Sequence, residues 1–126
     1  MRYIVFSFDD GLADFKDNAL PILNKYGFKC TINVISGFSD GTITTDFNYL
    51  SVDDIIELNN NGFDIANHTN SHLKGGSFDE LLLCNQKINQ WCGKQGVVGI
   101  AMPKYEKPNQ SAINFVKQLN PPYITY

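Results

Sequence analysis

Short apolar runs alternate along this chain with stretches in which apolar residues recur at helical spacing. Residues 3–8 form a near-continuous apolar run with β-branched and aromatic members, which predicts a strand buried on both faces, as in a parallel sheet. Similar runs predict four further strands, at residues 30–35, 63–66, 97–102 and 123–126.

The stretches between these runs have helical periodicity and recognisable ends. The first helix is expected from about residue 12, with Pro21 kinking it or starting its second half, and to stop at Gly27. Ser77 and Glu80 have the spacing of a capping box for a later helix. Residues 38–50 are polar and lack periodicity, which predicts a loop on the functional side. Polar residues suited to cap the three later helices are Ser51, Ser77 and Asn109.

The predicted elements alternate as β-α-β-α-β-α-β-α-β, with no repeat and no linker. Such alternation is typical of an α/β protein with a parallel sheet and right-handed crossovers. In open parallel sheets and in (β/α) barrels alike, functional sites form at the carboxyl ends of the strands. Polar residues at those ends are therefore the first candidates for chemistry.

Two polar motifs directly follow predicted strands. The first strand ends in Ser-Phe-Asp-Asp-Gly at residues 7–11, and the third leads into His-Thr-Asn-Ser-His at residues 68–72. Taken alone, each has an ordinary explanation: a tight turn or helix-capping acids for the first, and solvated histidines in a polar loop for the second. Their joint placement at strand ends favours a shared site.

The two motifs together offer a set of metal ligands. Asp10, His68 and His72 would supply one oxygen and two nitrogens to an ion such as Zn²⁺. Three protein ligands leave a fourth position for water, which is the pattern of a catalytic site rather than a structural one. Asp9 is expected to point to the other side of the strand end, where it would take the proton of that water.

These residues resemble motifs of a known family. Residues 7–11 and 68–72 resemble the first and second motifs of the polysaccharide deacetylases, the metal-dependent N-deacetylases of the chitooligosaccharide-deacetylase homology domain. Residues 27–34 resemble the second strand of that family, and residues 50–65 resemble the helix and strand before its second motif. The resemblance runs from residue 1 to about residue 105.

The resemblance implies a distorted (β/α) barrel that hydrolyses an N-acetyl group, usually on a glucosamine unit, with O-acetyl groups of carbohydrates as the alternative. It implies that Asp9 is the general base and that Asp10, His68 and His72 bind one divalent metal ion. Zn²⁺ is the ion expected first, and Co²⁺, Ni²⁺ and Mn²⁺ are the alternatives.

The segment Ala-Met-Pro-Lys-Tyr at residues 101–105 resembles a weak third motif. The family implies that Pro103, Lys104 and Tyr105 contact the substrate and supply a backbone N–H to the oxyanion. Many members carry an arginine in this motif that orients the base, whereas Ala101 and Met102 occupy the region here. Lys104 stands where the family's tyrosine is expected, and Tyr105 follows one position later.

The family's fourth motif, and its fifth with a histidine that acts as general acid, have no counterpart in this sequence. We therefore expect a single domain over residues 1–126, ending after the third motif as an incomplete barrel that lacks the family's C-terminal portion. Such a chain leaves an open sheet edge. Either the chain is a fragment, or a partner or second copy covers that edge, or the fold is a smaller open α/β sheet. Three alternatives remain. The chain is an active deacetylase, a truncated relative that binds metal or carbohydrate with little or no turnover, or a domain that binds neither.

Composition narrows the range of partners. The chain has 126 residues, 43% of them hydrophobic and 18% charged, which suits one globular domain. The net charge is −3 and the basic residues do not cluster, which argues against nucleic-acid binding. No apolar run is long enough to cross a membrane, and the first run is too short for a signal peptide. A cytoplasmic protein is expected from the sequence as written, or a secreted or envelope-associated one if a leader was removed.

Overall fold

A computed structural model describes residues 2–74, 76–93, 97–119 and 124–125. Every neighbouring pair of strands is parallel, and the strands lie side by side in chain order. A doubly wound sheet reverses its strand order whereas a (β/α) barrel does not, so this order confirms the predicted incomplete (β/α) barrel. The strands of the described sheet are β1 (Ser7–Phe8), β2 (Thr31–Val34), β3 (Asp64–Asn67), β4 (Val97–Ala101) and β5 (Ile124–Thr125).

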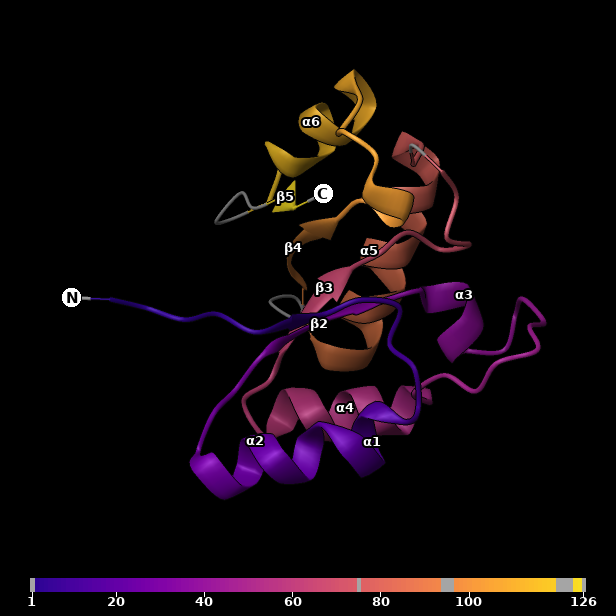
Figure 1. Ribbon diagram of the computed structural model, residues 1–126. Helices are drawn as coiled ribbons and strands as arrows, with labels where there is room; N and C mark the ends of the chain where they lie inside the picture. The colour runs from indigo at the N-terminus through magenta and orange to yellow at the C-terminus, as the bar shows by residue number, and fades with distance from the viewer. Residues whose placement is uncertain (1, 75, 94–96, 120–123, 126) are drawn as a thin grey trace.

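Helices connect these strands and cover the sheet from outside. Figure 1 shows α1, α2 and α4 along one side of the strands and α5 behind β3 and β4. Residues 38–50, predicted to form a loop, begin inside the short helix α3. The helices are α1 (Phe15–Asn18), α2 (Leu20–Tyr26), α3 (Ser36–Ser39), α4 (Val52–Asn60), α5 (Phe78–Cys92) and α6 (Gln110–Val116), with the 3-10 helix η1 (Pro103–Tyr105) after β4.

The main core lies between the sheet and its helices. Ile32 and Val34 of β2 and Ile65 of β3 are fully buried there, against Ile55 of α4 and Ile88 of α5. Burying such aliphatic side chains stabilises the fold by roughly 1.5–3 kcal/mol each. A second cluster joins α5, β4 and α6 through Leu81, Ile100, Met102, Ala112, Phe115 and Val116.

Several predicted helix ends are confirmed. The first helix is interrupted at Ala19, and Pro21 lies in the first turn of α2, where its missing N–H costs no helical hydrogen bond. Gly27 ends α2 in the left-handed conformation, with φ 68°. Ser51 begins α4 in a capping box with Asp54, whose carboxylate accepts a hydrogen bond from the Ser51 N–H.

The prediction for the N-terminal strand is wrong over residues 3–6. The strand β1 contains only Ser7 and Phe8, and Tyr3, Ile4 and Val5 are 81%, 83% and 76% exposed. Since Ser7 pairs with Thr31 at the start of β2, the residues before Ser7 lie beyond the first residue of the neighbouring strand. The Phe6 carbonyl still accepts a hydrogen bond from the Thr31 N–H, but the residues before Phe6 extend past the start of β2 and stay exposed.

The other predicted strands differ from the observed ones only at their ends. They correspond to β2, β3, β4 and β5, and of the last prediction residues 123 and 126 lie outside the described residues. Among the helices of the described chain, none combines the length and the apolar character needed to cross a bilayer.

The predicted capping box of α5 is half formed. The Ser77 hydroxyl accepts a 3.2 Å hydrogen bond from the Glu80 N–H, as expected. The Glu80 carboxylate accepts hydrogen bonds from Asn70 and Ser71 rather than from the Ser77 backbone. The Glu80 carboxylate therefore bonds to a distant loop instead of completing the capping box at the start of its own helix.

Candidate metal centre

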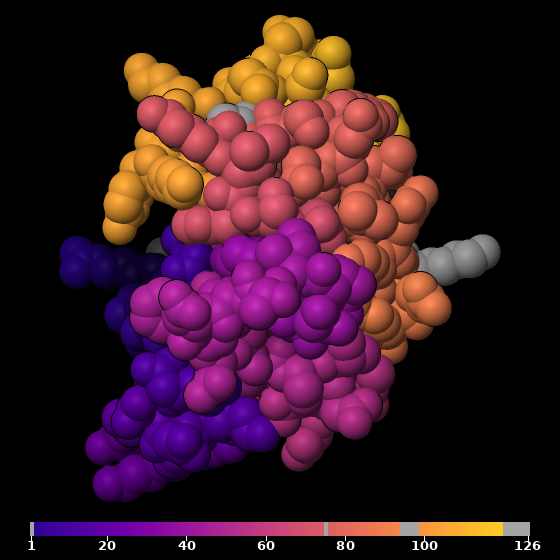
Figure 2. Space-filling model, turned by 90° about the vertical axis from the view of Figure 1, so that its right-hand side faces the viewer, coloured from indigo at the N-terminus to yellow at the C-terminus, as the bar shows by residue number. Residues whose placement is uncertain are grey.

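Both polar motifs lie at the same rim of the sheet. The first follows β1 and the second follows β3, with only β2 between these parallel strands. Figure 2 views the molecule from the side on which β2 leads into α3. Because parallel strands end at a common edge, segments sixty residues apart in sequence meet there.

Asp10, His68 and His72 converge at this rim, as the sequence predicted. The Asp10 Oδ1 atom lies 3.3 Å from His68 Nε2 and 3.3 Å from His72 Nε2. One ligand atom from each residue lies within 4.8 Å of the other two. One carboxylate oxygen and two imidazole nitrogens therefore face a common point, which fits a divalent ion that accepts oxygen and nitrogen ligands.

The imidazole of His68 is fixed by a contact on its other side. Its side chain is 2% exposed, and its Nδ1 atom lies 2.9 Å from the carbonyl oxygen of Ala101 in β4. Since a carbonyl oxygen only accepts, Nδ1 carries the hydrogen and donates it. The Nε2 lone pair is then free to bind a metal ion. In metal-binding histidines the other ring nitrogen usually donates a hydrogen bond, as Nδ1 does here.

The backbone at this rim adopts left-handed conformations that ordinary residues avoid. Asp10 has φ 70°, Thr69 has φ 67° and His72 has φ 57°. For residues other than glycine such conformations cost energy, and they persist only where surrounding contacts enforce them. Two of the three residues are the candidate ligands Asp10 and His72.

The turn after Asp10 is anchored by the segment that precedes α4. The Leu50 N–H donates to the Gly11 carbonyl at 2.8 Å, and the Ala13 N–H donates to the Asn48 carbonyl at 2.9 Å. The end of the predicted 38–50 loop therefore lies beside the first motif, on the functional side as expected.

Asp9 lies beside the ligand cluster and is held by a residue that sequence reasoning missed. The Asp9 Oδ1 atom accepts a 2.6 Å hydrogen bond from Asn33 Nδ2, which also lies 2.8 Å from the Ser7 hydroxyl. Asn33 is 1% exposed, and its Oδ1 atom has no hydrogen-bond partner among the described residues. The available signal was one amide side chain inside an otherwise apolar strand, opposite the first motif.

The charges of the cluster suit metal binding. The close contact with the His68 imidazole lowers the pKa of Asp10 more than burial raises it, so this carboxyl is ionised at neutral pH. Burial lowers the pKa of His72, although Asp10 opposes this effect, so that imidazole is neutral at neutral pH. Metal ions bind the ionised carboxylate and the neutral imidazole.

The third predicted motif follows β4 as η1. Pro103 is buried, whereas the Tyr105 side chain is 92% exposed. Lys104 and Tyr105 have φ values of 61° and 55°, so the turn is as unusual as those of the first two motifs. The segment η1 begins two residues after Ala101, whose carbonyl contacts His68, so η1 lies beside the cluster. The substrate and oxyanion roles of these three residues remain predictions.

Fold and site together define a (β/α)-barrel protein with a candidate metal centre at the carboxyl ends of its strands. A family model described as polysaccharide deacetylase matches residues 1–124, which reaches further than the motifs alone indicated. The chain belongs to the polysaccharide deacetylase family.

Relatives of known sequence and structure agree with this assignment. The chain is 34% identical over 73 residues to the "Putative polysaccharide deacetylase YxkH" of Bacillus subtilis (strain 168), covering 58% of this chain and 24% of that protein. The Streptococcus pyogenes deacetylase PplD, solved in complex with acetate, matches with a TM-score of 0.77 and 27% identity, over 92% of this chain and 52% of that one.

A third relative shares the fold at lower identity. The family 4 acetyl xylan esterase from Clostridium thermocellum, solved in complex with a cobalt ion, has a TM-score of 0.67 and 23% identity, over 89% of this chain and 53% of that one. The chain thus spans about half the length of these two solved relatives.

Proposed function

We propose that this chain is a metal-dependent hydrolase that removes acetyl groups from a carbohydrate. The convergence of Asp10, His68 and His72, with Asp9 beside them, carries the proposal. Membership of the polysaccharide deacetylase family supports acetylated carbohydrate as the substrate class. N-acetyl groups are the first expectation and O-acetyl groups the alternative.

The donor set fits one divalent ion held by Asp10, His68 and His72. Zn²⁺ accepts one carboxylate and two imidazoles readily, and Co²⁺, Ni²⁺ and Mn²⁺ are alternatives with the same kinds of ligand. An ion bound there lowers the pKa of water and polarises a carbonyl oxygen. The contact between His68 Nδ1 and Ala101 supports this assignment, because it presents the opposite ring nitrogen to the ion.

Asp9 is proposed as the general base. It accepts the proton of the water that attacks the acetyl carbonyl carbon, while the hydrogen bond from Asn33 keeps its carboxylate oriented. The bond from that carbon to the amine nitrogen then breaks, and the amine leaves with a proton while acetate is released. Asp9 returns the proton, or a group outside this chain supplies it, since both histidines of the sequence are assigned to the ion.

Backbone N–H groups of η1 are proposed as oxyanion donors. The segment Pro103–Tyr105 follows β4 at the same rim, and the charge of Lys104 acts on His72. Developing negative charge on the acetyl oxygen would be stabilised by a donor fixed in advance, an effect worth a factor of about 10²–10³ in rate.

Metal analysis combined with acetate release tests the proposal. The purified chain is expected to retain one divalent ion and to release acetate from chitooligosaccharides or from acetylxylan. Asp9→Asn should abolish acetate release and leave metal content unchanged, whereas Asp10→Ala and His72→Ala should lose metal. Retention of metal without acetate release from any sugar tested would favour the alternative, a truncated relative that binds metal or carbohydrate without turnover. A chain that retains no metal contradicts the proposal.

A further inference from the structure

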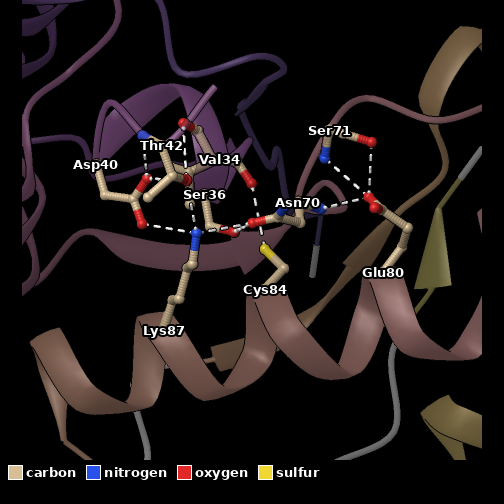
Figure 3. Close-up of polar contacts among 10 residues, drawn as sticks. Val34, Ser36, Asp40, Thr42, Asn70, Ser71, Glu80, Cys84 and Lys87 are labelled. Atoms are coloured by element: carbon tan, nitrogen blue, oxygen red, sulfur yellow. Dashed lines mark hydrogen bonds and ion pairs between the residues drawn. The ribbon is translucent and has the colours of Figure 1, made fainter. Parts of the chain in front are cut away.

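Three side chains on one face of α5 contact the loop between the two histidines or the end of β2. Glu80, Cys84 and Lys87 follow one another at helical spacing and point toward the ends of β2 and β3 (Figure 3). The Cys84 thiol lies 3.6 Å from the Val34 carbonyl oxygen, which holds α5 against the end of β2. The charged neighbours of Cys84 contact the polar loop.

Glu80 accepts three hydrogen bonds from that loop through a single oxygen. Its Oε2 atom lies 3.1 Å from the Asn70 N, 2.8 Å from the Ser71 N and 3.0 Å from the Ser71 hydroxyl oxygen. Hydrogen bonds to an ionised acceptor are about twice as strong as neutral ones. The carboxylate therefore fixes the backbone midway between His68 and His72.

The opposite side of the loop is held by the start of α3. The Ser36 N–H donates to the Thr69 carbonyl at 3.3 Å, and the Gly37 N–H donates to the Asn70 carbonyl at 2.9 Å. A Cβ atom on Gly37 would lie 2.6 Å from the Asn70 carbonyl oxygen, so only glycine permits this approach. The loop is thus enclosed between α3 and α5.

The side chain of Asn70 is fixed as firmly as its backbone. Its Oδ1 atom accepts hydrogen bonds from the Ser36 hydroxyl and from Lys87 Nζ, both at 2.9 Å. Lys87 also pairs with Asp40 at 2.6 Å and donates to Thr42. Asn70 is 8% exposed, so these bonds form with little competition from water.

We propose that Glu80 is a positioning residue of the metal centre, acting through the loop Thr69–Ser71 to place His72 against Asp10. His68 lies directly at the end of β3 and is fixed by Ala101, whereas His72 lies four residues further along the chain, after this loop. The left-handed conformations of Thr69 and His72 require enforcing contacts, and Glu80 provides three hydrogen bonds beside them. This inference rests on the proposed metal-binding function.

The test compares Glu80→Ala and Glu80→Gln with matched changes at Asp79, an exposed acid in the same first turn of α5. Asp79→Asn and Asp79→Ala alter the charge at the helix start equally but leave the loop contacts intact. Zn²⁺ affinity is measured by calorimetry, Co²⁺ coordination by visible absorption, and exchange of the Asn70 and Ser71 amide protons by NMR of the metal-free protein. All are measured below the unfolding temperature of every variant.

Glu80→Ala is expected to bind Zn²⁺ about 10-fold to 100-fold more weakly than the unmodified chain, with an altered Co²⁺ spectrum. Glu80→Gln retains one neutral acceptor and should be intermediate, and both Asp79 variants should match the unmodified chain. Amide exchange at residues 70 and 71 should be faster in the Glu80 variants.

Unchanged affinity and exchange in both Glu80 variants would overturn the inference while leaving the proposed function standing. Equal losses in the Glu80 and Asp79 variants would also overturn it, because the cause would then be charge at the helix start. If the unmodified chain binds no metal, the proposed function and the positioning role fail together, and amide exchange still reports whether Glu80 holds the loop.

Discussion

Asn33 donates a 2.6 Å hydrogen bond from β2 to the carboxylate of Asp9 at the end of β1. The contact follows from strand register: Ser7 pairs with Thr31 and Phe8 with Ile32, which brings the next residues opposite each other. The proposed base is therefore oriented by the neighbouring strand rather than by its own turn.

Asn33→Ala is expected to lower kcat for acetate release by about 10²-fold, because a freely rotating Asp9 is misplaced relative to the attacking water. Metal content should stay unchanged, since Asn33 does not contact the cluster atoms of Asp10, His68 or His72. Acetate release and metal analysis on the same preparations check this. Ser7→Ala, which removes the other partner of Asn33 Nδ2, is the control and should have the smaller effect. Equal kcat values for Asn33→Ala and the unmodified chain would contradict the role.

Metal binding should weaken in acid because protons compete for the imidazole nitrogens. Burial keeps the pKa of His72 below its usual value of 6.5, and the contact with His68 keeps that of Asp10 below 3.8. Affinity should therefore be nearly constant near neutral pH and fall, by about tenfold per pH unit, once the pH drops through the lowered pKa of His72.

Zn²⁺ titrations at a series of pH values check this expectation. The loss of affinity should follow His72 and not the carboxylate, because the pKa of Asp10 is held below 3.8. An affinity that falls only where Asp10 takes up a proton would contradict binding of the ion by His72.

The ion pair between Asp40 and Lys87 should contribute stability that disappears in acid. Burial raises the pKa of Asp40, but hydrogen bonds from Lys87 and Thr42 outweigh it and lower the pKa below 3.8. A carboxyl whose folded pKa is lowered stabilises the fold above its unfolded pKa, and this contribution is lost as pH falls through the folded value.

Asp40→Asn should therefore reduce the free energy of unfolding by about 1 kcal/mol at pH 7 and by less near pH 3. Denaturant unfolding at both pH values measures the difference. Asp46→Asn, a change at an exposed acid of the same loop, is the control. A pH-independent loss in Asp40→Asn would mean that the effect is packing rather than charge.

Gly37→Ala should damage the metal centre from a distance. An added methyl group would meet the Asn70 carbonyl oxygen at 2.6 Å and the Ile43 side chain at 2.6 Å, so the loop must move. We expect a loss of about 1–3 kcal/mol in stability together with weaker Zn²⁺ binding. Gly41→Ala is the control, because nothing lies within 4 Å of its added Cβ and its cost, about 1 kcal/mol, is in the left-handed backbone alone. Normal Zn²⁺ binding in Gly37→Ala would contradict the enclosure of the loop.

Local chemistry made part of this structure predictable from sequence. Gly27 and Ser51 end and begin helices through contacts with their own neighbours, so residue type and spacing were enough to place them. The convergence of Asp10 with His68 and His72 could be predicted because parallel strands share an edge.

The sequence does not show which distant groups compete for the same hydrogen-bonding side chain. Glu80 has the spacing of a capping box, yet its carboxylate bonds to residues of the second motif. The side chain of Asn33 finds its partner through strand register, which the apolar pattern of β2 does not reveal. Residues 3–6 have strand composition, yet β1 begins only at Ser7, opposite the first residue of β2, and pattern alone does not specify where a neighbouring strand begins.

Ala101 has a consequence for how the site tolerates distortion. Its carbonyl fixes the His68 ring, and two residues later the same backbone enters the segment Pro103–Tyr105. A displacement at the end of β4 would therefore reach both the His68 imidazole and the N–H groups of that segment. One short stretch of backbone thus connects a candidate metal ligand to the proposed oxyanion donors, so a substitution that shifts the end of β4 should affect both.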